Sequence, residues 1–282
     1  MRYFKLSKLL KTNFLYFTGL LLLCWCQGFC QQKNDEVNFQ VASGSGVKDP
    51  NLHDSIFFSL EEALKAPLRV SELSLEGKNL KRFPASILTF KNIHTLNISY
   101  NRIDSIPTNL FDKCRKLRMV QYAGNELKEV PAVLFHPALK VLDVSENNLT
   151  AIPDGVSKCT QLEELDLHSN RITAYPSSSF VLKSLKSLIL SGNPLTSLGS
   201  WVLNQPTLKI LFIDNTPIED LPENMCQMNA LRFLNIEENA IKELPPCFCE
   251  LKKLKVMMVS GSALSEAKLM EVNRCLPDLQ IR

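Results

Sequence analysis

A repeat of about 23 residues constrains the fold of this chain more than any other feature of its sequence. Units that start at Leu139 and Leu162 share the pattern L-x-x-L-x-L-x-x-N-x-L-x-x-I-P, with a few apolar or aromatic exchanges. Nine such units follow one another at spacings of 22–24 residues, and they start at Val70, Ile93, Leu117, Leu139, Leu162, Leu185, Leu208, Leu231 and Leu254. Random sequence does not keep such a register, so the chain is predicted to stack nine similar structural units.

Each unit begins with residues that alternate between apolar and polar. Leu142 and Val144 alternate with Asp143 and Ser145, which is the period of a short strand with one buried face. Roughly fifteen residues then remain before the next strand, and a parallel connection needs about that length. One unit cannot bury its own leucines, so neighbouring units must bury them together.

Two more positions recur after each predicted strand. A carboxamide both donates and accepts hydrogen bonds, so it can satisfy the backbone groups of a buried turn. We expect this role for Asn101, Asn125, Asn147, Asn170, Asn193 and Asn239. Thr216 and Ser262 offer a hydroxyl instead, whereas Lys78 cannot do the same and predicts a looser first turn. Proline, which fixes φ, stands six residues further on in most units, and Gly199 replaces it in the sixth.

On these residues the chain resembles the leucine-rich-repeat family, in particular its short exported bacterial members. The resemblance implies an α/β solenoid, a horseshoe whose concave side is a parallel β-sheet, with N- and C-terminal caps. It also implies a non-catalytic recognition module, because concave surfaces in this family bind proteins or peptides. A fold alone does not fix a function, and the partner is not implied.

The first thirty residues have the composition of a secretory signal peptide. Four basic residues and no acids precede an apolar run of 13 residues, Phe14 to Cys26, which is short for a membrane span. We therefore expect residues 1–30 to be a signal peptide and the protein to be periplasmic, cell-surface or secreted. Lipid modification of Cys24 or Cys30 is the alternative, and a lipid anchor would then hold the protein at a membrane.

The rest of the chain divides into a spacer and one repeat domain. Residues 31–56 are polar with glycine, serine and proline, a composition typical of a flexible linker. The leucine-rich-repeat domain is predicted at 57–282, with a cap at 57–69, nine repeats at 70–275 and a terminal strand at 276–282. Ten strands are expected in all.

Both ends of the repeat domain carry helix-start signals. Ser59 and Glu62 have the spacing of a capping box, and Phe57, Leu60 and Leu64 are expected to cover the first repeat. Near the C-terminus, Ser265 is expected to cap a helix that runs to about Arg274. Such caps are needed because a terminal repeat otherwise exposes its core.

Charge and motifs argue against several functions. Without residues 1–30 the chain has 28 basic and 29 acidic side chains, so nucleic acid is a poor partner. No phosphate-binding glycine loop, H-E-x-x-H or G-x-S-x-G motif occurs, so we predict no enzyme activity and no cofactor. His168, beside Asp143, Glu164 and Asp166, is the one histidine placed for acid–base or metal chemistry. The simpler reading is that concave positions favour polar residues.

Six cysteines follow residue 30. Cys226 and Cys249 are each the nineteenth residue of adjacent repeats, so we expect them to lie roughly one strand spacing, about 5 Å, apart on the convex side. A disulfide between them is geometrically allowed if their side chains face each other, and free buried thiols are the alternative. Cys159 takes a leucine position and Cys114 a similar one, so both are expected to be small buried side chains.

The predicted concave face changes character along the chain. The third and fifth residues of each repeat should face the concavity, because the fourth and sixth face the core. These positions are acidic in the middle, at Asp143, Glu164 and Asp166, and apolar in repeats six to nine, at Ile189, Ile210, Phe212, Phe233, Val256 and Met258. We predict that a protein or peptide partner places its apolar anchor on this patch, with Asp143 and Asp166 orienting basic residues and Glu164 and His168 beside them.

A different class of function remains open. Isoleucine, phenylalanine and valine suit strands whether or not they bind anything. The alternative is therefore a structural, envelope-spacing protein without a tight ligand.

Overall fold

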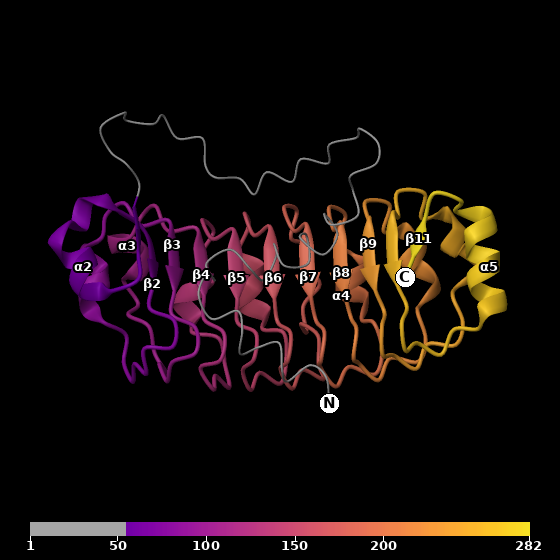
Figure 1. Cartoon of the computed structure of the whole chain (residues 1–282), viewed down its shortest axis with the longest axis horizontal. Helices are drawn as coiled ribbons and strands as arrows, with labels where there is room; N and C mark the ends of the chain where they lie inside the picture. The colour runs from indigo at the N-terminus through magenta and orange to yellow at the C-terminus, as the bar shows by residue number, and fades with distance from the viewer. Residues whose placement is uncertain (1–54) are drawn as a thin grey trace. The chain divides into compact units, whose positions relative to one another are not determined.

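The computed structural model describes residues 55–282, which form one unit on a parallel sheet of eleven strands (Figure 1). Each strand pairs with its neighbours in the sequence, so the order in the sheet is the order in the chain, from β1 to β11. The expected signal peptide at 1–30 and nearly all of the expected spacer at 31–56 lie outside the described residues.

The strands are short, and a short helical segment lies between most pairs of consecutive strands, with none between β6 and β7. The strands are β1 Ser55–Phe57, β2 Val70–Ser74, β3 Thr95–Asn97, β4 Met119–Gln121, β5 Val141–Asp143, β6 Glu164–Asp166, β7 Ser187–Ile189, β8 Ile210–Phe212, β9 Phe233–Asn235, β10 Val256–Met258 and β11 Gln280–Ile281. The α-helices are α2 Leu60–Lys65, α3 Leu110–Lys113, α4 Ser200–Leu203 and α5 Glu266–Cys275, and the 3₁₀ helices are η2 Pro67–Arg69, η3 Ala85–Thr89, η4 Ala132–Leu134, η5 Asp154–Lys158, η6 Glu223–Gln227 and η7 Pro246–Glu250. None of the described helices is long and apolar enough to span a membrane.

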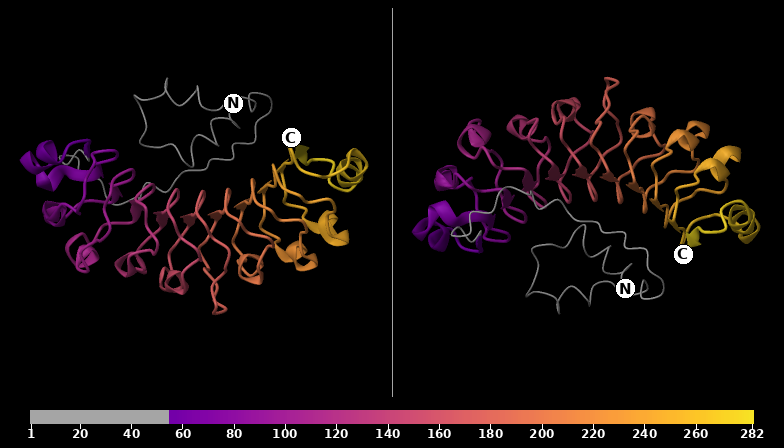
Figure 2. Two further views of the ribbon diagram at one scale, coloured as in Figure 1. Left: turned by 90° about the horizontal axis from the view of Figure 1, so that it is seen from below. Right: turned by 90° about the horizontal axis from the view of Figure 1, so that it is seen from above.

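The described unit is an arc, with the strands on its inner side and the helical segments on its outer side (Figure 2). Neighbouring strands are about 4.8 Å apart, whereas an α-helix with its side chains is about 10 Å across. The outer layer therefore needs more width than the inner one, and the sheet curves away from it. This confirms the predicted solenoid with a concave parallel sheet.

The sheet has one strand more than the ten predicted. Ser55 and Phe57 pair in parallel with Val70 and Leu73 of β2, so a strand precedes the first cap helix. The N-terminal cap consequently begins at Ser55, and the last two residues assigned to the spacer belong to the sheet.

The caps follow the sequence signals in part. Helix α2 begins after Ser59, but the Ser59 side chain makes no capping hydrogen bond. Leu64 is 44% exposed, contrary to prediction, because the packed face of this short helix is that of Leu60 and the fully buried Ala63. At the other end, the Ser265 hydroxyl accepts a hydrogen bond from the backbone N–H of Lys268 at 3.2 Å, as predicted.

The core is one continuous stack of the leucine positions. Leu142, Val144, Leu165 and Leu167 are completely buried, and the same cluster continues from Ala63 to Leu279. Burying such a side chain stabilises the fold by about 1.5–3 kcal/mol. Every interior repeat contributes several buried apolar side chains, and these are buried only between stacked neighbours. The stability of the fold therefore depends on the stacking of repeats and not on any single repeat.

The asparagine positions close the turns after the strands, as predicted. Asn147 is buried; its Nδ2 donates to three backbone carbonyls at 2.9–3.1 Å and its Oδ1 accepts from two backbone N–H groups at 2.8 and 3.0 Å. The Thr216 hydroxyl donates to the Ile213 carbonyl at 2.8 Å, whereas Lys78 is exposed. The side chains therefore supply the hydrogen bonds that the buried bend lacks.

The residue before each of these positions has a positive φ, between 51° and 68°, in all nine repeats: Gly77, Tyr100, Gly124, Glu146, Ser169, Gly192, Asn215, Glu238 and Gly261. Only four of them are glycine. An L-residue in this conformation costs about 1–2 kcal/mol. The buried hydrogen bonds of the next residue must therefore hold the turn in this shape.

Gly199 stands where most repeats have proline because there is no room for a side chain. The ring of Tyr175 lies so close that a Cβ on Gly199 would overlap its carbon atoms. The Tyr175 hydroxyl donates to the Ser197 carbonyl at 2.9 Å, which holds the ring in this place. The exchange in repeat six is thus paired with the tyrosine in repeat five.

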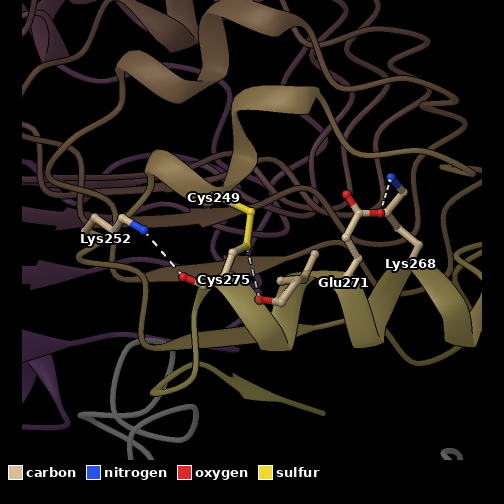
Figure 3. The surroundings of a disulfide bond; sticks show 6 residues. Cys249, Lys252, Lys268, Glu271 and Cys275 are labelled. Atoms are coloured by element: carbon tan, nitrogen blue, oxygen red, sulfur yellow. Dashed lines mark hydrogen bonds and ion pairs between the residues drawn. A yellow bond between two sulfur atoms is a disulfide. The ribbon is translucent and has the colours of Figure 1, made fainter.

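Two disulfides join the last turns of the convex side. Cys226 of η6 is bonded to Cys247 of η7 with a Cα separation of 5.9 Å. Cys249 of η7 is bonded to Cys275 of α5 with a Cα separation of 5.6 Å (Figure 3). The disulfide between Cys226 and Cys249 that the repeat spacing allowed is not formed, so that prediction is wrong. Cys247 and Cys249 are two residues apart on one tight turn, so they face opposite neighbours and each bonds to the cysteine on its own side.

The other two cysteines of the described residues are free thiols. Cys114 and Cys159 are completely buried, as predicted. Burial raises the pKa of each thiol to about 11, so both stay protonated and unreactive at neutral pH.

Candidate functional site

Two rows of side chains run along the concave face of the sheet. The strand register places the third positions side by side as Val141, Glu164, Ser187, Ile210, Phe233 and Val256, and the fifth positions as Asp143, Asp166, Ile189, Phe212, Asn235 and Met258. The structure thus brings the predicted acidic and apolar residues onto one continuous surface.

The apolar strip consists of Ile189, Ile210, Phe212, Phe233, Val256 and Met258, on β7 to β10. Ile189, Phe212 and Val256 are at most 9% exposed, since side chains one strand apart are close enough to pack on each other. Ile210, Phe233 and Met258 are half-buried. The strip therefore has a buried floor of three side chains and a surface of three that solvent reaches.

His168 lies just beyond β6 between two carboxylates. Its Nδ1 is 2.8 Å from Asp166 Oδ1 and its Nε2 is 3.8 Å from Glu146 Oε1. Burial disfavours the charged ring, but the hydrogen bonds with Asp166 and Glu146 outweigh it and raise the pKa of His168 to about 10. The ring is therefore a fixed cation at neutral pH, and metal binding or proton transfer would need the neutral form.

Two residues of the hydrogen-bond network around this histidine were not singled out from the sequence. Glu146 pairs with His168, and the Tyr100 hydroxyl donates to the same Glu146 carboxylate. Both are residues of positive φ that precede the asparagine positions. Their sequence shows no strand alternation, so nothing local indicated that they face the concave side.

The carboxyl groups of Asp143 on β5 and Glu164 on β6 resist ionisation. Burial and the neighbouring Asp166 raise the pKa of Asp143 to about 6, and burial with the charges of Asp166 and Asp143 raises the pKa of Glu164 to about 7. Asp143 Oδ1 accepts from the N–H and the hydroxyl of Ser145 at 3.0 and 2.6 Å. Within residues 55–282, the Glu164 side chain has no ion pair and no hydrogen bond.

Glu164→Gln is expected to flatten the pH dependence of stability. A carboxyl group whose pKa is higher in the folded state binds more protons when the protein is folded. Its contribution to the free energy of unfolding is therefore fully present below about pH 4.5 and is lost as the pH rises through about 7. Between pH 5 and 8 the free energy of unfolding of the unmodified protein should fall by about 2 kcal/mol more than that of the variant. Urea unfolding at each pH measures this, and the exposed Glu129→Gln serves as control. Parallel curves for all three proteins would contradict the prediction.

The arrangement suits an extended macromolecule better than a small molecule. Ligand pockets are concave cavities that enclose most of the ligand, whereas these residues lie on an open sheet face (Figure 2). No group of three or more His, Cys, Asp or Glu side chains in the described part of the chain is arranged to hold a metal ion.

Comparisons with known proteins agree with this architecture. Models of the leucine-rich repeat match residues 92–114, 123–172 and 160–202. The chain is 31% identical to Receptor-like protein 9b of Arabidopsis thaliana over 100 residues, which are 34% of this chain and 10% of that protein. It is 31% identical to fibromodulin of Oryctolagus cuniculus over 83 residues, 29% of this chain and 55% of that protein. The matched segments thus span a tenth and about half of these relatives.

Solved structures share the fold at low sequence identity. A leucine-rich-repeat protein of Leptospira interrogans superposes with a TM-score of 0.58 and 21% identity, covering 76% of this chain and 61% of that one. An internalin from Listeria monocytogenes superposes with a TM-score of 0.56 and 17% identity, covering 79% and 70%. The family models therefore show leucine-rich repeats within residues 92–202, and the solved structures show the fold of leucine-rich-repeat proteins.

Proposed function

We propose that this protein is an exported, non-catalytic recognition module that binds a protein or peptide on the concave face of its sheet. The observation that carries the proposal is the apolar strip on β7 to β10. A solvent-facing sheet surface gains nothing from apolar side chains until something covers them, and exposed apolar patches on soluble proteins are often binding sites. The corresponding positions of β2 and β3 are polar: Glu72, Ser74, Thr95 and Asn97.

The strip alone is too small to account for tight binding. Full burial of a large apolar side chain contributes about 1.5–3 kcal/mol, and Ile210, Phe233 and Met258 are already half-buried. A micromolar complex needs about 8 kcal/mol net of association costs. Polar groups beside the strip must therefore contribute. The carboxylates of Asp143, Glu164 and Asp166 are proposed to face basic residues of the partner, with the cationic His168 beside them. Glu164 is the best placed of them, because the described chain offers it no cation.

Export is supported by disulfide bonds as well as by the expected signal peptide. Disulfides persist in oxidising compartments, and residues 55–282 contain two. The names of relatives, a receptor-like protein and fibromodulin, fit the same assignment. We propose a periplasmic, cell-surface or secreted location; the bacterial origin rests on resemblance to short exported bacterial members.

Ile210→Ser combined with Phe233→Ser is expected to weaken partner capture at least about tenfold without unfolding the solenoid. The test is capture of proteins from the source organism's cell envelope by the full chain, read out by quantitative mass spectrometry. Met119→Ser with Val141→Ser is the matched control, since both residues occupy the same row on β4 and β5 and are half-buried too.

The outcomes separate the two classes of function. Partners lost with the first pair of substitutions and kept with the second support binding at the strip. Partners lost equally with both pairs would overturn a site confined to the strip, and no partner at all would favour a spacing protein without a tight ligand.

A further inference from the structure

A row of basic side chains follows one edge of the apolar strip. The second residue of repeats six to nine is Lys186, Lys209, Arg232 or Lys255. The backbone N–H of each of the last three donates to the carbonyl of the one before it at 2.8 Å. Four cations therefore lie side by side just before the neighbouring strands β7 to β10, and each directly precedes a third-position residue of the concave face.

The same row already holds one carboxylate within the chain. Glu163 is the second residue of repeat five, and its Oε1 is 3.0 Å from Lys140 Nζ on one side while its Oε2 is 2.5 Å from Lys186 Nζ on the other (both are ion pairs). Burial opposes ionisation of Glu163, but the two lysines outweigh it and lower its pKa. A single carboxylate is thus able to link cations from two strands of this row.

Beyond Lys186 the row contains no acid. Within the described residues, the side chains of Lys209, Arg232 and Lys255 take part in no ion pair and no hydrogen bond. Like charges on neighbouring strands repel and destabilise a sheet. An arrangement that costs stability in the free protein, directly beside apolar side chains, indicates that an anionic partner relieves it.

We propose that the apolar strip binds an acidic polypeptide segment, whose Asp or Glu carboxylates lie between Lys209, Arg232 and Lys255 as Glu163 lies between Lys140 and Lys186. Apolar side chains of the same segment cover Ile210, Phe233 and Met258. The inference rests on the proposed function and adds an acidic segment of the partner, held at Lys209, Arg232 and Lys255 and separate from the basic residues proposed to face the carboxylates of β5 and β6. A planar anionic membrane is the weaker candidate, because a flat bilayer does not follow a concave sheet.

The experiment selects binders of the full chain from a displayed library of short random peptides. The selected peptides are expected to combine Asp or Glu with Phe, Leu or Met. Their affinity should fall at least about tenfold for Lys209→Gln with Arg232→Gln, and more steeply with added salt for the unmodified protein than for this variant. Lys158→Gln with Lys183→Gln is the matched control, since both lysines are exposed and make no ion pair in residues 55–282. Circular dichroism confirms that each variant is folded.

Each other outcome overturns a defined part of the proposal. If binding of the selected peptides depends on Ile210 and Phe233 but not on Lys209 and Arg232, the apolar strip remains the binding surface and the proposal of an acidic partner is overturned. Peptides that depend on neither pair, or no selected peptide, would overturn both. Competition by anionic phospholipid vesicles or by single-stranded DNA as strong as by the acidic peptides would show a general polyanion site instead.

Discussion

Reducing the two disulfides is expected to lower the free energy of unfolding by about 3 kcal/mol for each bond. The bonded cysteines are separated by 21 and 26 residues, and opening such loops returns conformational entropy mainly to the unfolded chain. Both bonds join the last turns of the arc, and Cys275 ends the helix α5 that covers the final repeat (Figure 3). Loss of this cap should therefore expose the C-terminal core first.

Urea unfolding with and without a reductant measures the effect. Cys249→Ser with Cys275→Ser should lose about half of the reductant response, and a variant that lacks all four bonded cysteines should lose all of it. The buried Cys114 and Cys159 remain in every protein, so they cannot account for a difference. Identical midpoints in oxidising and reducing conditions would contradict the prediction.

Asn147→Ala is expected to destabilise the protein by about 3 kcal/mol or more. The substitution removes five hydrogen bonds and leaves buried backbone donors and acceptors without partners, each of which costs about 1–3 kcal/mol. It also releases the turn at Glu146, whose φ is 51°. Relaxation of the turn and entry of water offset part of these costs, so the expected loss in free energy of unfolding is smaller than their sum.

The neighbouring asparagine provides the control. Asn148 is half-buried, and its side chain makes no hydrogen bond in the described structure, so Asn148→Ala should change the free energy of unfolding by less than about 0.5 kcal/mol. Both values come from the same urea unfolding experiment. Equal losses for the two variants would mean that the carboxamide at position 147 does not hold the turn.

Most of the fold could be predicted from the sequence because it depends on local periodicity. Alternation within a few residues decides which side of each strand is buried, so the positions of Leu142 and Val144 follow from the pattern alone. The spacing of the repeats implies a parallel stack, and the chemistry of a carboxamide assigns the role of Asn147. The capping role of Ser265 and the burial of Cys114 and Cys159 likewise follow from local sequence.

The candidate site is only half determined in this way. The repeat places Ile210, Phe212 and Phe233 on the concave face. Their exposure to solvent depends on packing between strands, which buries Phe212 and leaves Ile210 and Phe233 half-buried. The pairing of His168 with Glu146 joins residues 22 positions apart, and no local pattern specifies it.

Tertiary structure alone decided the features that depend on where side chains point between repeats. Cys226 bonds to Cys247 rather than Cys249 because a tight turn sends residues two apart toward different neighbours. Gly199 is needed because of a ring from the preceding repeat. Periodicity specifies which repeats are neighbours and which face each residue takes, but the contacts between neighbours depend on side-chain direction, and that is set only when the repeats are stacked.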